Sequence, residues 1–414
     1  MDTHANLIKQ FNALPENWNA WLIENIQRGC APEELAQILL REGLIDPTKT
    51  SMHSNQQAQE HLSWLEEIVE QKNRSNPAQD LTQEQKTWLA QALFEQKTKE
   101  QIYQTLKAQG LNEIDIANEL VHLKQNPYFK IAQQQHFLLQ KRNWLLDTLD
   151  RFARLNIAYN EIERIQVPSF EHFVQHYYSR NLPVILNNAI DHWDARKKWS
   201  PEYFRKTIAD KKIEVQFNRE RDPLFERNSI QHKTQMTMND FVDLIEQNPH
   251  SNNFYMTANN AKASHSNLSE LFKDIGEFHD FTDHEQVRKR SFIWFGPKGA
   301  FTPLHHDLTN NFLVQIYGKK KVTLIPAMQT PHLYNDVAVF SQIADPHDPQ
   351  MIEQFPELKK CSKIECILNE GDALFIPIGW WHCVESLHVS ISVSFTHFNI
   401  DNGGAESFPY PSQI

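Results

Sequence analysis

The sequence predicts an α+β protein in which an all-α N-terminal region precedes a C-terminal antiparallel β domain, either a barrel or a double-sheet jelly roll. Two observations support this division. Only eleven glycines occur and seven of them follow residue 295, and tight β-turns need residues that tolerate positive φ. The first 160 residues are instead rich in Gln, Glu, Leu and Ala, which favour helices.

The helical region contains an internal repeat. Residues 21–44 align without a gap on residues 88–111, and Trp21 matches Trp88 at the start of the two copies. The matched apolar residues follow helical spacing, and each copy ends in a Gly-Leu pair suited to a helix C-cap. Each copy is therefore expected to form a helix-turn-helix unit, and the polar stretch 73–80 is the expected linker between them.

A long helix is expected over about residues 127–157. Leu138, Leu145 and Phe152 recur every seven residues, and Leu149 adds to the same side. Such a stripe fits a dimerisation or partner helix, packing against the repeat units, or a surface for a substrate protein. A homodimer through the N-terminal helices is one expectation from this pattern.

The rest of the chain changes character in two steps. Residues 162–260 mix helical and strand patterns, and strand signals dominate from Ser291 onward. The spacing of those strands and their turns predicts the barrel or jelly roll. We therefore expect a helical region over 1–160 and a catalytic domain over 161–414, with the barrel core at about 254–400.

Bulk composition excludes several classes of protein. The formal net charge of −11 argues against sequence-independent binding of nucleic acid, which requires a basic face. No stretch approaches the ~20 apolar residues of a membrane span, and the N-terminus lacks the order of a signal peptide. The four cysteines, Cys30, Cys361, Cys366 and Cys383, are too few and too irregular for a zinc site and fit reduced thiols. A cytoplasmic location is expected.

Two segments point to a metal site. In "FTPLHHDLTN" (301–310), His305 and Asp307 are two apart and would share a strand face, whereas His306 would point away. In "EGDALFIPIGWWHCVESL" (370–387), His382 follows a buried strand that can bring it across a small barrel. Two imidazoles and one carboxylate with open positions form the facial triad suited to Fe(II); zinc more often takes three histidines or closes a tetrahedron.

Oxygen activation at such an iron would need a co-substrate that supplies electrons. 2-Oxoglutarate does so by chelating the metal through its keto-acid end, and its distal carboxylate then needs a cationic partner. No Lys or Arg follows Lys363, so the candidates are Lys319, Lys320 and Lys321 in "YGKKKVTL". Strand alternation would turn one of them inward.

These residues resemble the JmjC-type, cupin-like 2-oxoglutarate oxygenases, especially the HIF asparaginyl hydroxylase and the JmjC arginyl hydroxylases. The resemblance covers roughly residues 165–398 and is carried by "NLPVILNNAIDHW", "GPKGAFTPLHHDLTNNFLVQIYGKKKVTLIPA" and "EGDALFIPIGWWHCVESL". It implies a double-stranded β-helix, a cupin jelly roll, that binds Fe(II), 2-oxoglutarate and O2. His305, Asp307 and His382 then stand at the iron-binding positions.

The resemblance also implies a co-substrate pocket. Lys320, fifteen residues after the first iron ligand, matches the family's lysine anchor, and Thr302 resembles its threonine partner for the distal carboxylate. Asn311 matches an asparagine near the iron, and Tyr255 resembles the tyrosine that completes the pocket. Ser394 stands where some members carry asparagine, a departure shared with the branch nearer the arginyl hydroxylases.

The function implied is hydroxylation of a protein or peptide side chain with release of succinate and CO2. N-methyl-lysine demethylation is the nearest alternative, because it uses the same hydroxylation step. A cupin isomerase or metal-dependent binding protein is an alternative without oxidation. A binding scaffold with an inactive barrel is a fourth reading, which the complete set of candidate ligands disfavours.

Overall fold

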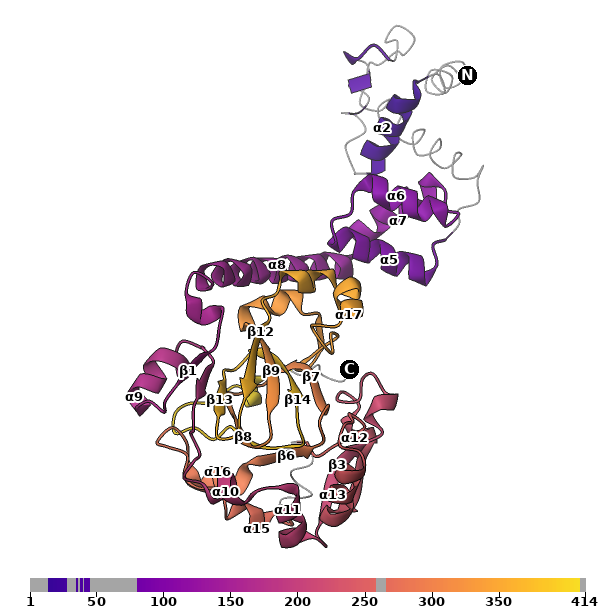
Figure 1. Ribbon diagram of the computed structural model, residues 1–414. Helices are drawn as coiled ribbons and strands as arrows, with labels where there is room; N and C mark the ends of the chain where they lie inside the picture. Colours follow the sequence, from indigo (N-terminus) through magenta and orange to yellow (C-terminus); the bar gives the residue numbers. More distant parts are fainter. Residues whose placement is uncertain are drawn as a thin grey trace. The chain divides into compact units, whose positions relative to one another are not determined.

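The chain folds into two compact units, Met1–Arg142 and Asn143–Ile414, with the division inside one long helix. The computed structural model describes residues 14–27, 35, 38–39, 41–44, 80–257 and 266–409 (Figure 1). The predicted linker 73–80 lies outside the described residues except for its last position, and so does Cys30.

All regular secondary structure among the described residues of the first unit is helical. Its helices are α2 (Glu16–Gln27), α5 (Gln83–Phe94), α6 (Lys99–Ala108), α7 (Glu113–Gln125) and the first part of α8 (Pro127–Ala153). Thr82 and Thr98 begin α5 and α6 with capping boxes, each completed by a glutamine three residues later. Gly110, at φ 92°, ends α6 in the left-handed conformation expected for a C-cap.

The second copy of the sequence repeat is thus a helix, a turn and a helix, formed by α5 and α6. Buried apolar residues hold these helices against α7, namely Leu89, Ala92, Ile102, Leu106 and Ile116. In the first copy α2 is described, but much of the following segment lies outside the described residues. Leu44 N–H donates to Leu39 O, and the equivalent Leu111 N–H donates to Leu106 O. The two copies therefore end with the same backbone hydrogen bond.

Two six-stranded sheets form the body of the second unit. The first sheet has the order β1 (Glu163–Ile165), β2 (Val184–Leu186), β13 (Ala373–Ile376), β8 (Asn311–Tyr317), β15 (Ser390–Phe395), β6 (Phe292–Gly296). The second has the order β10 (Asn335–Val337), β11 (Phe340–Ser341), β7 (Phe301–His306), β14 (Trp381–Ser386), β9 (Lys320–Ile325), β12 (Ile364–Leu368). Every pairing in the two sheets is antiparallel except that of β1 with β2.

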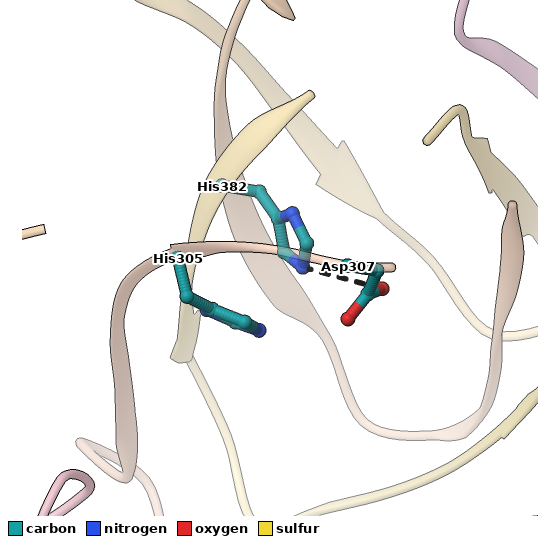
Figure 2. Close-up of side chains that lie close together, drawn as sticks. All are labelled: His305, Asp307 and His382. Atoms are coloured by element: carbon teal, nitrogen blue, oxygen red, sulfur yellow. Dashed lines mark ion pairs between the residues drawn. The ribbon is translucent and has the colours of Figure 1, made fainter. Parts of the chain in front are cut away.

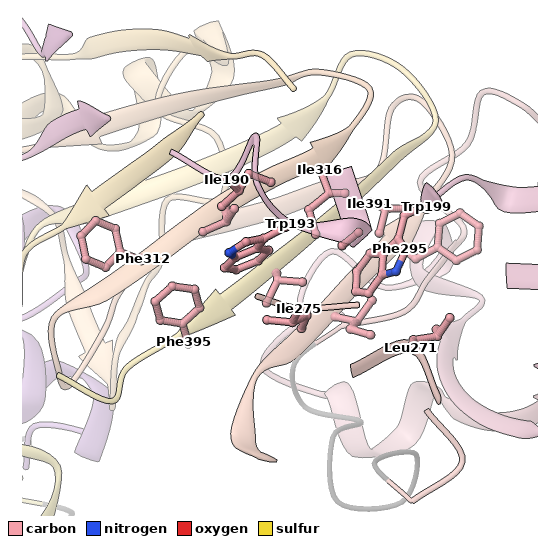
Figure 3. Close-up of a cluster of buried hydrophobic side chains, with 14 of the residues drawn as sticks. Ile190, Trp193, Trp199, Leu271, Ile275, Phe295, Phe312, Ile316, Ile391 and Phe395 are labelled. Atoms are coloured by element: carbon pink, nitrogen blue, oxygen red, sulfur yellow. The ribbon is translucent and has the colours of Figure 1, made fainter. Parts of the chain in front are cut away.

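Strand alternation gives the first sheet two different faces. Along β15, Ile391, Val393 and Phe395 join a large aromatic and aliphatic core that also contains Trp193 and Phe295 (Figure 3). The intervening serines, including Ser394, face the other side. That side meets the second sheet through a smaller apolar cluster that contains Leu313 and Ile376 together with residues of β9, β12 and β14. Small polar side chains on an inward face leave room for a cavity between the sheets.

Helices and a small third sheet complete the second unit. The third sheet has the order β4 (Lys233–Thr237), β3 (Lys212–Phe217), β5 (Phe254–Tyr255). The helices are α9 (Phe170–Phe173), α10 (Asp194–Lys198), α11 (Pro201–Ile208), α12 (Ser229–His232), α13 (Met238–Gln247), α15 (Ser269–Phe272), α16 (His284–Arg290) and α17 (Pro349–Gln354). Over the described residues, no helix combines the length and apolar character that crossing a bilayer requires.

One predicted helix is shorter than the sequence suggested. The helix expected over 127–157 ends at Ala153, and a 3-10 turn follows at Ile157–Tyr159. Further along, α9 continues directly into a π-helical turn over Val174–Tyr178. The three described cysteines are free thiols, and burial raises the pKa of each to about 12.

Candidate metal centre

Strands β7 and β14 bring His305, Asp307 and His382 together. His382 lies directly opposite His305 in the antiparallel pairing of these strands, and Asp307 follows β7 immediately. The two imidazole centroids are 4.3 Å apart, and His382 Nε2 lies 3.9 Å from Asp307 Oδ2 (Figure 2). One possible ligand atom from each side chain lies within 4.8 Å of the others. Across the described parts of the chain, no other cluster of three or more His, Cys, Asp or Glu side chains meets this spacing.

The two imidazoles are held in the orientation that metal binding needs. His305 Nδ1 lies 2.8 Å from Pro303 O, and His382 Nδ1 lies 3.0 Å from Trp380 O. A carbonyl oxygen can only accept, so each Nδ1 donates and each Nε2 keeps its lone pair for a metal. Burial, reinforced by the neighbouring His305, lowers the pKa of His382, which keeps this ring neutral at physiological pH.

A β-bulge adds Thr302 to the same side of the sheet. Thr302 pairs with Val384 and His305 pairs with His382, so three steps along β7 correspond to two along β14. In a regular strand, residues three apart would face opposite sides, but the extra residue restores a common face. His306 points away, as its position next to His305 predicted, and packs edge-on against Trp381 at 4.8 Å.

All eight candidate site residues named from the sequence line one cavity of about 210 Å³ in the second unit. Its lining comprises Glu226, Tyr255, Trp294, Thr302, His305, Asp307, Asn311, Leu313, Lys320, Val339, Phe340, Ile376, His382, Val384 and Ser394. One end carries the histidines and the aspartate. Tyr255 of β5, Trp294 of β6 and Lys320 at the start of β9 also line the cavity, which takes residues from both six-stranded sheets.

Lys320 is the one lysine of its cluster that is buried, with 1% of its surface exposed. Its Nζ donates to Tyr255 Oη at 2.9 Å and lies 5.9 Å from the ring centroid of Trp294. Burial lowers the pKa of this ammonium group to about 7. Lys319 is exposed, and Lys321 forms an ion pair with Glu385 at 3.0 Å on the outer side of β9.

Asn311 and Ser394 line the cavity, and each makes a hydrogen bond with another lining residue. Asn311 Nδ2 donates to Asp307 Oδ2 at 3.0 Å and thereby orients the carboxylate. Its Oδ1 is buried and accepts no hydrogen bond from any described protein group, so it is available to a donor within the cavity. Ser394 Oγ accepts a hydrogen bond from Trp294 Nε1 at 2.8 Å, which fixes the indole against the pocket.

Seven lining residues were not identified from the sequence, among them Glu226 and Trp294. Glu226 is 7% exposed and comes from the irregular segment after β3, where no periodicity marks its direction. The fully buried Arg219 lies beside it, with Nη2 at 3.8 Å from Glu226 Oε2 and 2.7 Å from Phe301 O, to which it donates. Burial lowers the pKa of Arg219 to about 10, which still leaves it a cation at neutral pH.

Comparisons with known proteins assign the domain that carries the cavity to a family. Residues 170–401 match the Cupin-like domain family. Lysine-specific demethylase 8 of Xenopus tropicalis is 31% identical over 240 residues, which cover 56% of this chain and 52% of the relative. JmjC domain-containing protein D of Dictyostelium discoideum is 29% identical over 255 residues, 56% of this chain and 55% of that protein.

A third relative has a different name. tRNA wybutosine-synthesizing protein 5 of Gallus gallus is 25% identical over 252 residues, covering 56% of this chain and 78% of the relative. The chain spans little more than half the length of the demethylase relatives. The similarity therefore concerns the domain that carries the cavity.

Proposed function

The chain belongs to the Cupin-like domain family, and we propose that it is an Fe(II)- and 2-oxoglutarate-dependent dioxygenase that hydroxylates a side chain of a protein or peptide. The observation that carries the proposal is the presence, in one cavity, of a His-Asp-His group and a buried lysine. In this proposal the two six-stranded sheets form the double-stranded β-helix of a jelly roll. The helical repeat units lie outside the part of the chain to which the activity is assigned.

The residues of the cavity fit such a metal. Two neutral imidazoles and one carboxylate on one face suit Fe(II) and leave coordination positions open. His305, His382 and Asp307 would hold the ion, and the buried acceptor Asn311 Oδ1 would accept a hydrogen bond from a group bound there. Iron with 2-oxoglutarate and O2 would supply the oxidising chemistry, converting 2-oxoglutarate into succinate and CO2.

The protein's own contribution is to bind, orient and exclude water. Lys320 and Tyr255 would bind the distal carboxylate of 2-oxoglutarate by a charge-assisted hydrogen bond and a phenolic one. Thr302, brought to this face by the bulge, would add a hydroxyl donor. Asn311 keeps the Asp307 carboxylate in place. No residue has to act as a general base, because the hydrogen is removed from carbon by the oxidant and not as a proton.

A cationic side chain is the substrate that the cavity wall favours. Glu226 places a buried carboxylate at the lining, 3.8 Å from Arg219 Nη2, and a guanidinium or ammonium group of the substrate would share this carboxylate with Arg219. Relatives named as lysine- and arginine-specific demethylases add support for a basic residue. Demethylation of an N-methyl group on such a residue is the second candidate, since both outcomes begin with hydroxylation at the same centre.

Turnover of 2-oxoglutarate tests the proposal. Purified protein is loaded with Fe(II) under low oxygen, supplied with 2-oxoglutarate, O2 and a library of Arg- and Lys-containing peptides, and assayed for succinate. Peptides that stimulate succinate formation are then examined by mass spectrometry. Gain of one oxygen supports hydroxylation, and loss of a methyl group supports demethylation.

A matched pair of variants separates the remaining alternatives. Asp307→Ala removes a proposed ligand, whereas His306→Gln alters a neighbouring ring that packs away from the cavity. Succinate formation should be lost in the first and kept in the second. Failure of the unsubstituted, iron-loaded protein to form succinate with or without peptides would favour a non-oxidative cupin or an inactive scaffold.

A further inference from the structure

The last turns of α8 expose large apolar side chains on one side. Trp144, Leu145, Leu149 and Phe152 are 66%, 49%, 45% and 64% exposed, and Leu155 and Ile157 just beyond the helix are 84% and 68% exposed. We call these six residues the α8 face. Soluble monomers rarely expose contiguous apolar surface of this extent unless it forms an interaction site.

The opposite side of the same turns is polar and faces the rest of the second unit. Asp147 Oδ1 lies 3.0 Å from His332 Nε2, Asp150 Oδ1 accepts a hydrogen bond from Gln329 Nε2 at 2.9 Å, and Arg154 Nη2 donates to the carbonyl of residue 360. A surface helix normally does the reverse, with its apolar stripe toward the core. These hydrogen bonds hold the helix in an orientation that leaves its apolar side outward.

We propose that the α8 face binds a second copy of this chain and forms a two-fold symmetric dimer. Taking about 200 Å² for a fully exposed large apolar side chain, the exposed parts of the α8 face amount to roughly 700 Å² per chain. A standard protein interface buries roughly 800 Å² per partner, so a self-complementary contact centred on this face reaches the required size. This inference concerns a surface separate from the cavity and does not rest on the proposed activity.

The charges beside the face favour an antiparallel arrangement of the two helices. Arg151 is exposed near the face, whereas Asp147 and Asp150 are engaged on the inner side. Parallel helices would set Arg151 against Arg151 of the second copy, and like charges at such spacing repel. Antiparallel helices instead place the residues at one end of the face opposite those at the other end, so that Trp144 approaches Phe152 of the second copy.

The oligomeric state of the full chain provides the first test. Light scattering after size-exclusion chromatography, at tens of micromolar protein, should give twice the chain mass. The double variant Leu145→Glu with Leu149→Glu should weaken the dimer at least 100-fold and run as a monomer with an unchanged circular dichroism spectrum. Ile367→Glu, which changes an apolar residue 38% exposed on β12, is the matched control and should stay dimeric.

Cross-linking tests the antiparallel arrangement. A mixture of Trp144→Cys and Phe152→Cys chains should cross-link through a short bis-maleimide far more than either variant alone, above the background of the unsubstituted chain. A monomeric unsubstituted protein would overturn the proposal. The α8 face would then be covered by another segment of this chain or by a different protein. A dimer that survives the double glutamate variant would overturn it too, and cross-linking confined to the single variants would overturn the antiparallel arrangement.

Discussion

Burial of Lys320 predicts that binding of 2-oxoglutarate is linked to uptake of a proton. Burial lowers the pKa of the ammonium group to about 7, and over the described residues no carboxylate forms an ion pair with it; its near neighbours are Tyr255 and Trp294. Below pH 7 the lysine is already charged, and an anion binds without proton uptake. Above pH 7 the amine is neutral and must take up a proton to pair with the distal carboxylate.

The size of this effect follows from the pKa. At pH 8 roughly one lysine in ten carries its proton, so the apparent Kd for 2-oxoglutarate should be about tenfold higher than at pH 6.5 and should rise about tenfold again by pH 9. Isothermal titration calorimetry of the protein saturated with Mn²⁺, in buffers of different ionisation enthalpy, should show uptake of about 0.9 proton at pH 8. A Kd that is constant from pH 6.5 to 8.5 would refute the reasoning.

Removing the charge should have opposite effects on binding and on stability. Lys320→Met keeps the apolar stem but removes a cation whose pKa is lower in the folded chain than in the unfolded chain. The unfolded chain holds the extra proton between pH 7 and the ordinary lysine pKa, so the wild-type protein gains stability as pH rises through that range. At pH 7 the variant should be more stable by up to about 4 kcal/mol in urea unfolding and should lose 2-oxoglutarate binding. The exposed Lys319→Met is the matched control, and destabilisation by Lys320→Met would contradict the assignment.

Three further predictions concern other parts of the second unit. His305→Ala and Asp307→Ala should each raise the Kd for Mn²⁺ at least 100-fold in calorimetry with little change in thermal midpoint, because neither side chain belongs to the apolar core. Glu226→Gln should slow turnover of peptides with a basic target residue more than tenfold while leaving the 2-oxoglutarate requirement within about twofold; equal loss with all peptides would argue against a role in recognising charge. Trp381→Ala should lower the free energy of unfolding by about 3–5 kcal/mol in urea titration, as expected for a large buried aromatic side chain.

Much of the site could be predicted from the sequence because strand alternation is a local rule. The two-residue spacing of His305 and Asp307 and the outward direction of His306 follow from it, and the structure brings His382 to them across 75 residues. The same rule requires one lysine of 319–321 to face a different side from its neighbours, and the structure buries Lys320. The assigned roles of these residues stay predictions.

Other features depended on tertiary structure that no local pattern reveals. Glu226 reaches the cavity from an irregular segment, and its direction is set by the neighbouring Arg219, which is anchored to the backbone of residue 301. For α8, the seven-residue spacing marked an apolar stripe, but three interpretations were open. The side that faces the protein was decided by hydrogen bonds that Asp147 and Asp150 accept from residues some 180 positions later.

Thr302 illustrates how a departure from regular geometry can be needed for a site. Alternation alone places Thr302 on the side opposite His305, where it could not contribute to the same pocket. The extra residue of the bulge lies in β7 between Thr302 and His305. It turns the side chain of Thr302 to the same face of the sheet as that of His305. Leu304, within the bulged segment, fills the outer apolar cluster with Trp381 and Cys383 instead. Burial of Leu304 on the outer side therefore stabilises the bulge, and the bulge sets the hydroxyl of Thr302 and the imidazole of His305 on one wall of the cavity.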